Sequence, residues 1–330
     1  MDNLTHGLLG LAVGSLGWPD RDDAKTRTGR ATVWASVIAA ELPDLDVFYG
    51  RGNPLAEFQY HRGITHSFLL APVVAAVAAA LTKLVFRKGR LGPLYLFSLA
   101  SVLFAHLVAD LWTGWGTMAL MPFSPARLGL DWASVVDPLL TLPLVVAALL
   151  ISVRPGGPER RRSIMAAALA VVFAYVGGRG LVHANLVRQV AARYPQASRL
   201  QVWPGLNPVG SWGYAAVLGD SYATGTVGPV QGVREVGMVP TPDRSNPAVA
   251  AALNTASLQP LFRFTAFPVV AAARMQGAGG GGTDLAVKDL TVTDLKYGYF
   301  AYRIRVDATG RASVVGGGES FRSGRRPAGS

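Results

Sequence analysis

The chain has 330 residues, of which 50% are hydrophobic and only 15% are charged, a balance too apolar for a simple soluble enzyme. Its 31 Lys and Arg exceed its 20 Asp and Glu, so the net charge is +11, which fits nucleic acid, an anionic membrane surface, or basic loops that orient membrane-spanning helices. There is no Cys, which excludes disulfides and thiolate metal sites and leaves His and carboxylates as the side chains that could hold a metal.

Six apolar segments follow one another in the first 182 residues and predict an all-α polytopic membrane helical bundle. The first two, Leu4–Trp18 and Ala31–Leu42, are shorter than the roughly 20 residues of a spanning helix, so we expect half-spans or helices buried among the others. The first segment has no basic leader and no small-residue cleavage site, which argues against a cleaved signal peptide. Four longer segments are expected to span the membrane, at residues 65–86, 94–112, 132–153 and 163–182.

Basic residues in the links between the apolar segments set the orientation. Cytoplasmic loops of membrane proteins carry an excess of Lys and Arg, and one alternating topology puts all the basic links in the cytoplasm. In that topology Met1, residues 43–65, residues 112–131 and everything after about His183 lie on the outer face of the membrane. The basic residues are Arg21, Lys25, Arg27 and Arg30 in one link, Arg87, Lys88 and Arg90 in the next, and Arg154, Arg160, Arg161 and Arg162 in the third.

The character of the sequence changes after the last apolar segment. We therefore expect a membrane-embedded domain over 1–184, a small β-rich (α+β) extramembrane domain over 185–320 and a basic disordered tail over 321–330. Within the second domain, residues 285–297 partly alternate between apolar and polar side chains and residues 299–306 alternate more cleanly, which predicts two antiparallel strands with Gly298 near the turn. Residues 277–282 are rich in Gly and are expected to form a flexible loop.

Ionisable side chains gather near the ends of the apolar segments. Each costs at least about 2.5–3.5 kcal/mol at membrane depth, so a cluster needs a compensating partner, of which a bound cation is the simplest. The topology was drawn from Lys and Arg alone, yet it brings four of the five His and four Asp to the same outer side. These are His6, Asp44, Asp46, His61, His66, His106, Asp110 and Asp137.

The spacing of two pairs favours metal binding. His106 and Asp110 are four residues apart, so both project from one face of a helix and can share an ion. Asp44 and Asp46 alternate around a proline-led turn, which suits one chelating and one bridging carboxylate. Without a metal, His106 and Asp110 could instead hydrogen-bond each other, and Asp44 could cap a turn.

The remaining His residues differ in their surroundings. His61 and His66 flank Gly63 across a loop-to-helix junction, where the backbone can bend so that both side chains reach inward. Between them, Arg62 is either structural or a fork for a phosphate or carboxylate. We expect His183, at the end of the last apolar segment, to be structural.

The candidate ligands also predict the metal and its chemistry. A set of His and carboxylates suits Zn²⁺, with Mn²⁺ or Fe²⁺ as alternatives, and eight ligands are too many for one tetrahedral ion, which predicts two ions. Such centres activate water, and a pair of ions stabilises both the attacking and the leaving oxygen of a phosphoester. Glu41 or an unligated carboxylate such as Asp46 would serve as general base.

The chain carries five motifs in the order Asp2-x-x-Thr5-His6, Pro43-Asp44-Leu45-Asp46, His61-Arg62-Gly63-x-Thr65-His66-Ser67, His106-x-x-x-Asp110-x-x-Thr113 with Gly116, and Pro122-Phe123-Ser124. In this order they resemble the membrane-bound metal-dependent hydrolase family, whose members include LexA-regulated inner-membrane proteins. The resemblance covers about residues 1–182 and implies a bacterial or archaeal inner-membrane protein with a metal site of His and Asp. The spacing of His106 and Asp110 is also similar to a motif of zinc-dependent phospholipase C and related nucleases.

The expected function is hydrolysis of a phosphoester or other ester of a lipid or cell-envelope molecule, because a site at the membrane surface favours an amphiphilic substrate. Asp46 and Asp137 would bridge or support the other ligands, and Arg62 would hold a substrate anion. Two other functions stay open. A metal transporter would place its ligands near the bilayer midplane rather than at one end, and an interaction protein would act through its β-rich domain. Nucleic-acid binding is not expected, because the basic links account for most of the positive charge.

Overall fold

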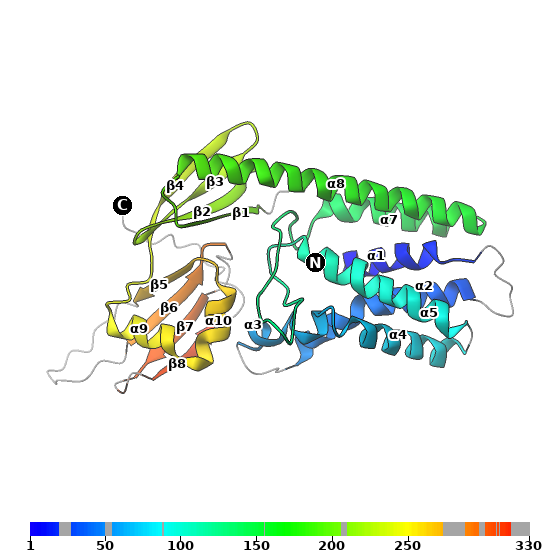
Figure 1. The fold of residues 1–330 in the computed structure, drawn as a ribbon, viewed down its shortest axis with the longest axis horizontal. Coiled ribbons are helices and arrows are strands. Elements are labelled where there is room, and N and C mark those ends of the chain that lie inside the picture. Colours follow the sequence, from blue (N-terminus) through cyan, green and yellow to red (C-terminus); the bar gives the residue numbers. More distant parts are fainter. Residues whose placement is uncertain are drawn as a thin grey trace. The chain divides into compact units, whose positions relative to one another are not determined.

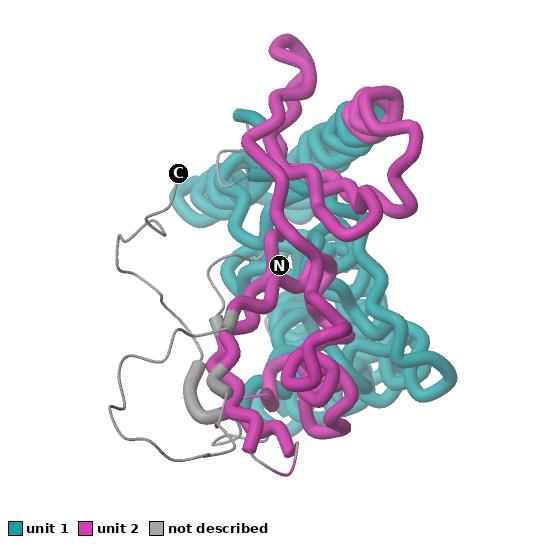
Figure 2. The backbone as a smooth tube through the Cα atoms, turned by 90° about the vertical axis from the view of Figure 1, so that its left-hand side faces the viewer, with its two compact units in different colours: residues 1–49, 60–185, 203–211 teal, residues 50–59, 186–202, 212–330 magenta. Residues whose placement is uncertain are grey.

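The computed structural model describes residues 1–19, 28–49, 55–87, 89–154, 156–205, 210–272, 288–296, 301–307, 309 and 311–317. The chain divides into two compact units (Figure 2). Unit 1 comprises residues 1–49, 60–185 and 203–211, and unit 2 comprises residues 50–59, 186–202 and 212–330. The basic residues Arg21, Lys25, Arg27 and Lys88, the turn at Gly298, the loop over 277–282 and the tail over 321–330 lie outside the described residues. The domain bounds expected from the sequence remain predictions.

Unit 1 is built from helices and short helical turns (Figure 1). Three consecutive elements, α5, η3 and α6, form one continuous helix over Leu91–Leu111, and η3 within it is π-helical. Only the last residues of the long helix α8 belong to unit 2. The elements are α1 (Asn3–Leu16), α2 (Thr28–Glu41), η1 (Leu42–Phe48), η2 (Ile64–His66), α4 (Ala71–Phe86), α5 (Leu91–Ala100), η3 (Ser101–Val108), α6 (Ala109–Leu111), α7 (Pro138–Val153) and α8 (Pro158–Arg193).

In the described part of the helical region, fewer helices than predicted from the sequence are long and apolar enough to span a membrane. Among the described residues, Leu91–Leu111 and Pro158–Arg193 are long and apolar enough to cross a membrane. A third span arises if Ala56–His66 and Ala71–Phe86, which meet at an 80° bend, count as one broken span. The segment predicted at 132–153 is helical only over the 16 residues of α7, because Asp137 caps a helix that starts at Pro138. Two or three of the four expected spans are thus matched by helices in the described residues.

Close packing of α1 against α2 depends on glycines. A Cβ added at Gly14 would lie 2.6 Å from the Cα of Val33, and one added at Gly10 would lie 2.8 Å from the carbonyl oxygen of Ser36. Small residues of this kind let helix backbones approach closely in membrane proteins. The approach fixes the start of α1 beside the end of α2, and both of these ends carry candidate site residues.

We expect Gly14→Ala to lower the melting temperature of the detergent-solubilised protein, because the new methyl group overpacks the α1–α2 interface at a typical cost of about 1–3 kcal/mol. The matched control is Gly177→Ala in α8, where an added Cβ meets nothing within 4 Å. At that position the loss of glycine flexibility should leave the melting temperature unchanged or raise it slightly. The melting temperatures are measured by circular dichroism. Equal values for the two variants would show that the α1–α2 interface does not require glycine at position 14.

Unit 2 contains two four-stranded sheets, ordered β1-β2-β3-β4 and β5-β6-β7-β8, with short helices beside the second. The two predicted strands correspond to β6 and β7, which pair antiparallel with Leu290 opposite Ile304, so this prediction is confirmed. In the same unit, Phe58 of α3 contacts the rings of Phe264 and Tyr302. The elements are α3 (Ala56–Tyr60), β1 (Arg199–Pro204), β2 (Trp212–Leu218), β3 (Ser221–Gly228), β4 (Gly232–Pro240), α9 (Pro247–Asn254), η4 (Ala256–Leu258), α10 (Gln259–Phe264), β5 (Pro268–Ala272), β6 (Lys288–Asp294), β7 (Ala301–Val306) and β8 (Ala312–Gly317).

Candidate metal centre

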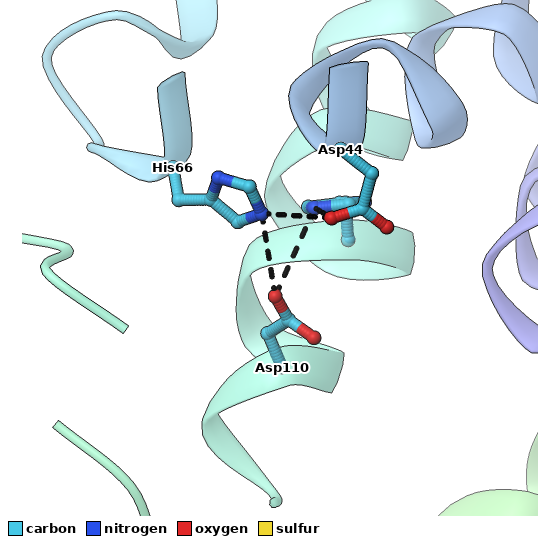
Figure 3. A group of neighbouring side chains, drawn as sticks. Asp44, His66 and Asp110 are labelled. Atoms are coloured by element: carbon cyan, nitrogen blue, oxygen red, sulfur yellow. Dashed lines mark hydrogen bonds and ion pairs between the residues drawn. The ribbon is translucent and has the colours of Figure 1, made fainter. Parts of the chain in front are cut away.

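Four buried side chains from four elements of unit 1 converge on one point (Figure 3). Asp44 comes from η1, which Pro43 opens, and His66 ends the short turn η2. His106 lies in the π-helical segment η3, and Asp110 follows in α6. Only Asp44 has any appreciable exposure, at 8%, whereas the other three are at 0%. A single-turn π-helical segment inside a long helix is frequent at functional sites.

The spacing of the four ligand atoms fits a metal ion. His66 Nε2 lies 3.1 Å from Asp44 Oδ1 and 3.5 Å from Asp110 Oδ2, and His106 Nε2 lies 3.6 Å and 3.8 Å from the same two oxygens. A tetrahedral ion with bonds of about 2.0–2.1 Å holds its ligand atoms about 3.4 Å apart. The two His106 distances are too long for hydrogen bonds but suit atoms that share an ion.

The contacts of the imidazole rings also fit a metal site. His106 Nδ1 donates to the carbonyl oxygen of Ala40 at 2.5 Å, which leaves the Nε2 lone pair facing the cluster. His106 Nε2 and Asp110 Oδ2 are buried and have no hydrogen-bond partner. Unpartnered buried polar atoms are costly, and metal-bound His residues commonly donate their other ring nitrogen to a carbonyl or carboxylate. The four side chains therefore could hold a metal ion.

Asp46 supports the cluster from outside. Its Oδ1 accepts from His61 Nδ1 at 2.7 Å, and its Oδ2 accepts from Thr65 Oγ1 at 2.7 Å and from the backbone N–H of Arg62 at 3.1 Å. His66 Nδ1 also lies 3.1 Å from Oδ2. Burial raises the pKa of Asp46, but the hydrogen bonds from His61 and His66 outweigh it and hold the pKa of this carboxyl well below its usual range. An ionised Asp46 fixes the ring of His66.

A second group of possible ligands adjoins the first. Asp44, Asp46 and His61 offer ligand atoms that lie within 4.8 Å of one another. Asp44 belongs to both groups, so its carboxylate could bridge two ions. The carboxylate of Asp46, however, already accepts the hydrogen bonds described above.

The other oxygen of Asp110 faces positive charge. Arg62 Nη2 lies 2.9 Å and His6 Nε2 lies 3.2 Å from Oδ1, and the Met1 amino group also contacts this atom. His6 Nδ1 donates to the carbonyl oxygen of Ala105, 2.8 Å away, and its ring stacks on His106 with 4.1 Å between centroids. His6 thus lies beside the four-residue cluster rather than in it.

Arg62, which was expected to hold a substrate anion, has its side chain directed at Asp110 in the structure. Its backbone has a φ of 56°, and its side chain is 3% exposed. Nη1 donates to Thr113 Oγ1 at 3.0 Å while Nη2 binds Asp110, so the guanidinium points into the protein. Because a bound anion would have to displace Asp110, the geometry favours a role in neutralising that carboxylate.

Asp137 is not brought into the cluster. It caps α7 by accepting from the N–H of Leu139 at 3.2 Å, and the hydroxyl of Tyr175 in α8 donates to its carboxylate at 3.0 Å. Its oxygens are occupied by these bonds, and it belongs to neither group of possible ligands. His183, which was expected to be structural, also belongs to neither group.

Glu41 lies at the outer edge of the cluster. Asn3 Nδ2 donates to Glu41 Oε2 at 3.0 Å and lies 3.4 Å from Asp44 Oδ2, so one amide joins the two carboxylates. Burial raises the pKa of Glu41. A carboxyl group with a raised pKa, next to possible metal ligands, is a suitable general base.

Sequence reasoning missed several supporting residues. Arg127 donates to the carbonyl oxygens of His61 at 3.1 Å and Gly116 at 3.0 Å, which ties the loop after α6 to the segment that carries His66. Asn3 and Thr113 were not singled out as site residues either. Thr113 and Gly116 stood in a recognised motif, which was the available signal, whereas nothing in the sequence marks Arg127.

Comparisons with known proteins cover mainly the helical region. A family model described as YdjM inner membrane protein matches residues 1–186. The uncharacterized protein YfhP of Bacillus subtilis is 26% identical over 159 residues. That match covers 48% of this chain and 48% of YfhP, so the chain aligns with about half the length of this relative. No solved structure matches the chain.

Proposed function

The chain belongs to the YdjM inner membrane protein family, the LexA-regulated inner-membrane family that its motifs resemble, and from this premise we propose that it is a membrane-bound metal-dependent hydrolase. The family and the two or three apolar helices indicate an inner membrane protein. The observation that carries the proposal is the pair of buried, unpartnered atoms, His106 Nε2 and Asp110 Oδ2, aimed at one point together with His66 and Asp44.

The proposed metal is Zn²⁺, with Mn²⁺ or Fe²⁺ as alternatives, because two imidazole nitrogens and two carboxylate oxygens suit these ions. The first ion would be held by Asp44, His66, His106 and Asp110. A second ion would use Asp44, Asp46 and His61, and Asp46 would have to exchange hydrogen bonds for a metal bond. When bound, such ions lower the pKa of water and polarise the oxygens of an ester.

Each nearby side chain has a proposed role. Glu41 takes the proton of the attacking water, and Asn3 orients Glu41. Asp46 holds the ring of His66, and Arg62 balances the charge of Asp110. In this assignment Asp137 only caps α7 and takes no part in the chemistry.

The proposed substrate is a phosphoester or other ester of a lipid or cell-envelope molecule. On η1 the inward-facing Asp44 alternates with apolar side chains that are open to the surroundings, such as Leu45 at 54% and Phe48 at 53% exposure. Ligands and exposed apolar side chains on the same turn favour an amphiphilic substrate. The basic links support the placement of the cluster, and of the C-terminal β-rich region, on the outer face of the membrane.

The test is an assay of the purified full chain in detergent, with metal counted by mass spectrometry. We expect chelator-sensitive cleavage of p-nitrophenyl phosphoesters or of phospholipids. Glu41→Gln should reduce kcat about 10²–10⁴-fold, the usual contribution of a general base, without changing the metal content. Protein that binds metal but cleaves none of these esters would contradict the proposal and favour metal transport. Glu41→Gln with unchanged kcat would remove Glu41 as the base.

A further inference from the structure

A second feature of unit 1 lies at the other end of α1. His6, near the start of this helix, adjoins the metal cluster, whereas Trp18, just after its end, lines a cavity of about 200 Å³. The end of α7 and the start of α8 form the rest of the wall. The lining residues are Trp18, Ile151, Gly156, Pro158, Arg160 and Arg161.

Two arginines of the lining are held in place by the protein. Arg160 Nη1 donates to the carbonyl oxygens of Arg154 and Leu150 at the end of α7. The guanidinium of Arg161 lies over the ring of Trp18, 4.4 Å from its centroid. Both charges are therefore fixed at the cavity rather than free to move with solvent.

Positive charge accumulates at this cavity. Arg30, at the start of α2, is close enough to Arg161 for the two positive charges to repel each other. In the part of the chain that the structure describes, no carboxylate forms an ion pair with Arg30, Arg160 or Arg161. An anion bound in the cavity would relieve this repulsion.

We propose that this cavity binds the phosphate group of an anionic phospholipid. The guanidinium fork matches phosphate oxygens, and basic pockets between membrane helices bind anionic headgroups on the cytoplasmic side. A lipid is favoured over a free phosphate ion because the adjoining end of α7 exposes apolar side chains, with Val153 at 75% and Leu149 at 57%, on which acyl chains can lie. This inference does not depend on the metal cluster or on hydrolysis.

Neighbouring glycines offer a test that changes no charge. A side chain at Gly156 would press on Arg160, since an added Cβ lies 2.6 Å from its Cδ, whereas one at Gly157 meets nothing within 4 Å. Gly156→Leu should therefore block the cavity, and Gly157→Leu is its matched control. A second pair compares Arg160→Gln/Arg161→Gln with Arg87→Gln/Arg90→Gln, which removes equal charge from another basic link.

The full chain and each variant would be reconstituted in nanodiscs that contain phosphatidylglycerol and phosphatidylcholine, and bound lipid counted by native mass spectrometry. We expect Gly156→Leu and Arg160→Gln/Arg161→Gln to retain about tenfold less phosphatidylglycerol than their controls, because each basic side chain near the headgroup contributes several-fold to affinity. Far-UV circular dichroism would verify that all variants fold.

Three outcomes would overturn the proposal. One is equal retention of phosphatidylglycerol by each variant and its control. Another is equal retention of phosphatidylcholine and phosphatidylglycerol by the unaltered chain. The third is full displacement of the lipid by inorganic phosphate at millimolar concentration, which would make the ligand a soluble anion.

Discussion

His106→Ala is expected to strip the protein of its metal and to reduce ester cleavage to the level of chelator-treated protein. The ring nitrogen Nε2 of His106 is buried, has no hydrogen-bond partner and faces Asp44 and Asp110 at 3.6 Å and 3.8 Å. Losing a residue that only orients a ligand costs about 10–100-fold in metal affinity, so losing the ligand itself should cost more than about 100-fold. Metal content after dialysis against a competing chelator measures the effect.

Two further variants separate ligands from their supports. His183→Ala removes a histidine that lies outside both groups of possible ligands, so its metal content should match that of the unaltered chain. Asp46→Asn keeps the four-residue cluster but weakens the contact that orients the ring of His66. Its metal affinity should fall by a factor of about 10–100, between the effects of His183→Ala and His106→Ala. Equal metal content in His106→Ala and His183→Ala would show that the cluster does not bind metal.

The residues of the cluster could be predicted from the sequence, but not the atoms that face the ion. Asp44, His66, His106 and Asp110 were all expected at one end of the helices, because charged groups at membrane depth need partners. The sequence does not show that His106 donates Nδ1 to Ala40, since that bond depends on how α2 packs against the π-helical segment η3. Which side chains face the proposed ion and which only hold other side chains in place therefore depends on how the helices pack.

Two residues expected at the site make contacts other than those predicted, for physical reasons. Asp137 precedes Pro138, and an Asp before a proline is a strong helix cap, so its oxygens bind α7 and Tyr175 rather than an ion. Arg62 follows His61 in a recognised motif, yet its left-handed backbone turns the guanidinium inward to Asp110. Such conformations depend on neighbouring loops, here on Met118, whose N–H donates to the carbonyl oxygen of Arg62 at 2.9 Å.

The sequence predicts more spans than the described helices provide, because apolar composition does not define helix length. The segment at 132–153 is apolar, but its first residues form a loop in which Trp132 and Ala133 donate backbone N–H groups to Trp112. The small residues of α1 and α2 explain why these two short helices are nevertheless well packed. The two strands β6 and β7 were predictable because their alternation has a period of two.

Arg62→Met is expected to make the stability of the protein depend on bound metal. Asp110 is fully buried; Arg62 binds Oδ1 at 2.9 Å beside the Met1 amino group, and Oδ2 faces the proposed ion. Removing one partner of a buried ion pair typically costs about 3–5 kcal/mol, because the remaining charge is left uncompensated. Metal on Oδ2 would offset part of this cost, so the variant should lose far more stability in chelator than in metal.

The measurement is a cycle of four melting temperatures, for the unaltered chain and Arg62→Met, each with Zn²⁺ and with chelator. If the metal and Arg62 stabilise the same carboxylate, the difference in melting temperature between Zn²⁺ and chelator must be larger for Arg62→Met than for the unaltered chain. Arg127→Met is the matched control, because Arg127 donates to the backbone carbonyls of His61 and Gly116, so its loss should lower stability equally with and without metal. If Zn²⁺ stabilises Arg62→Met no more than it stabilises the unaltered chain, the ion and Arg62 do not share Asp110.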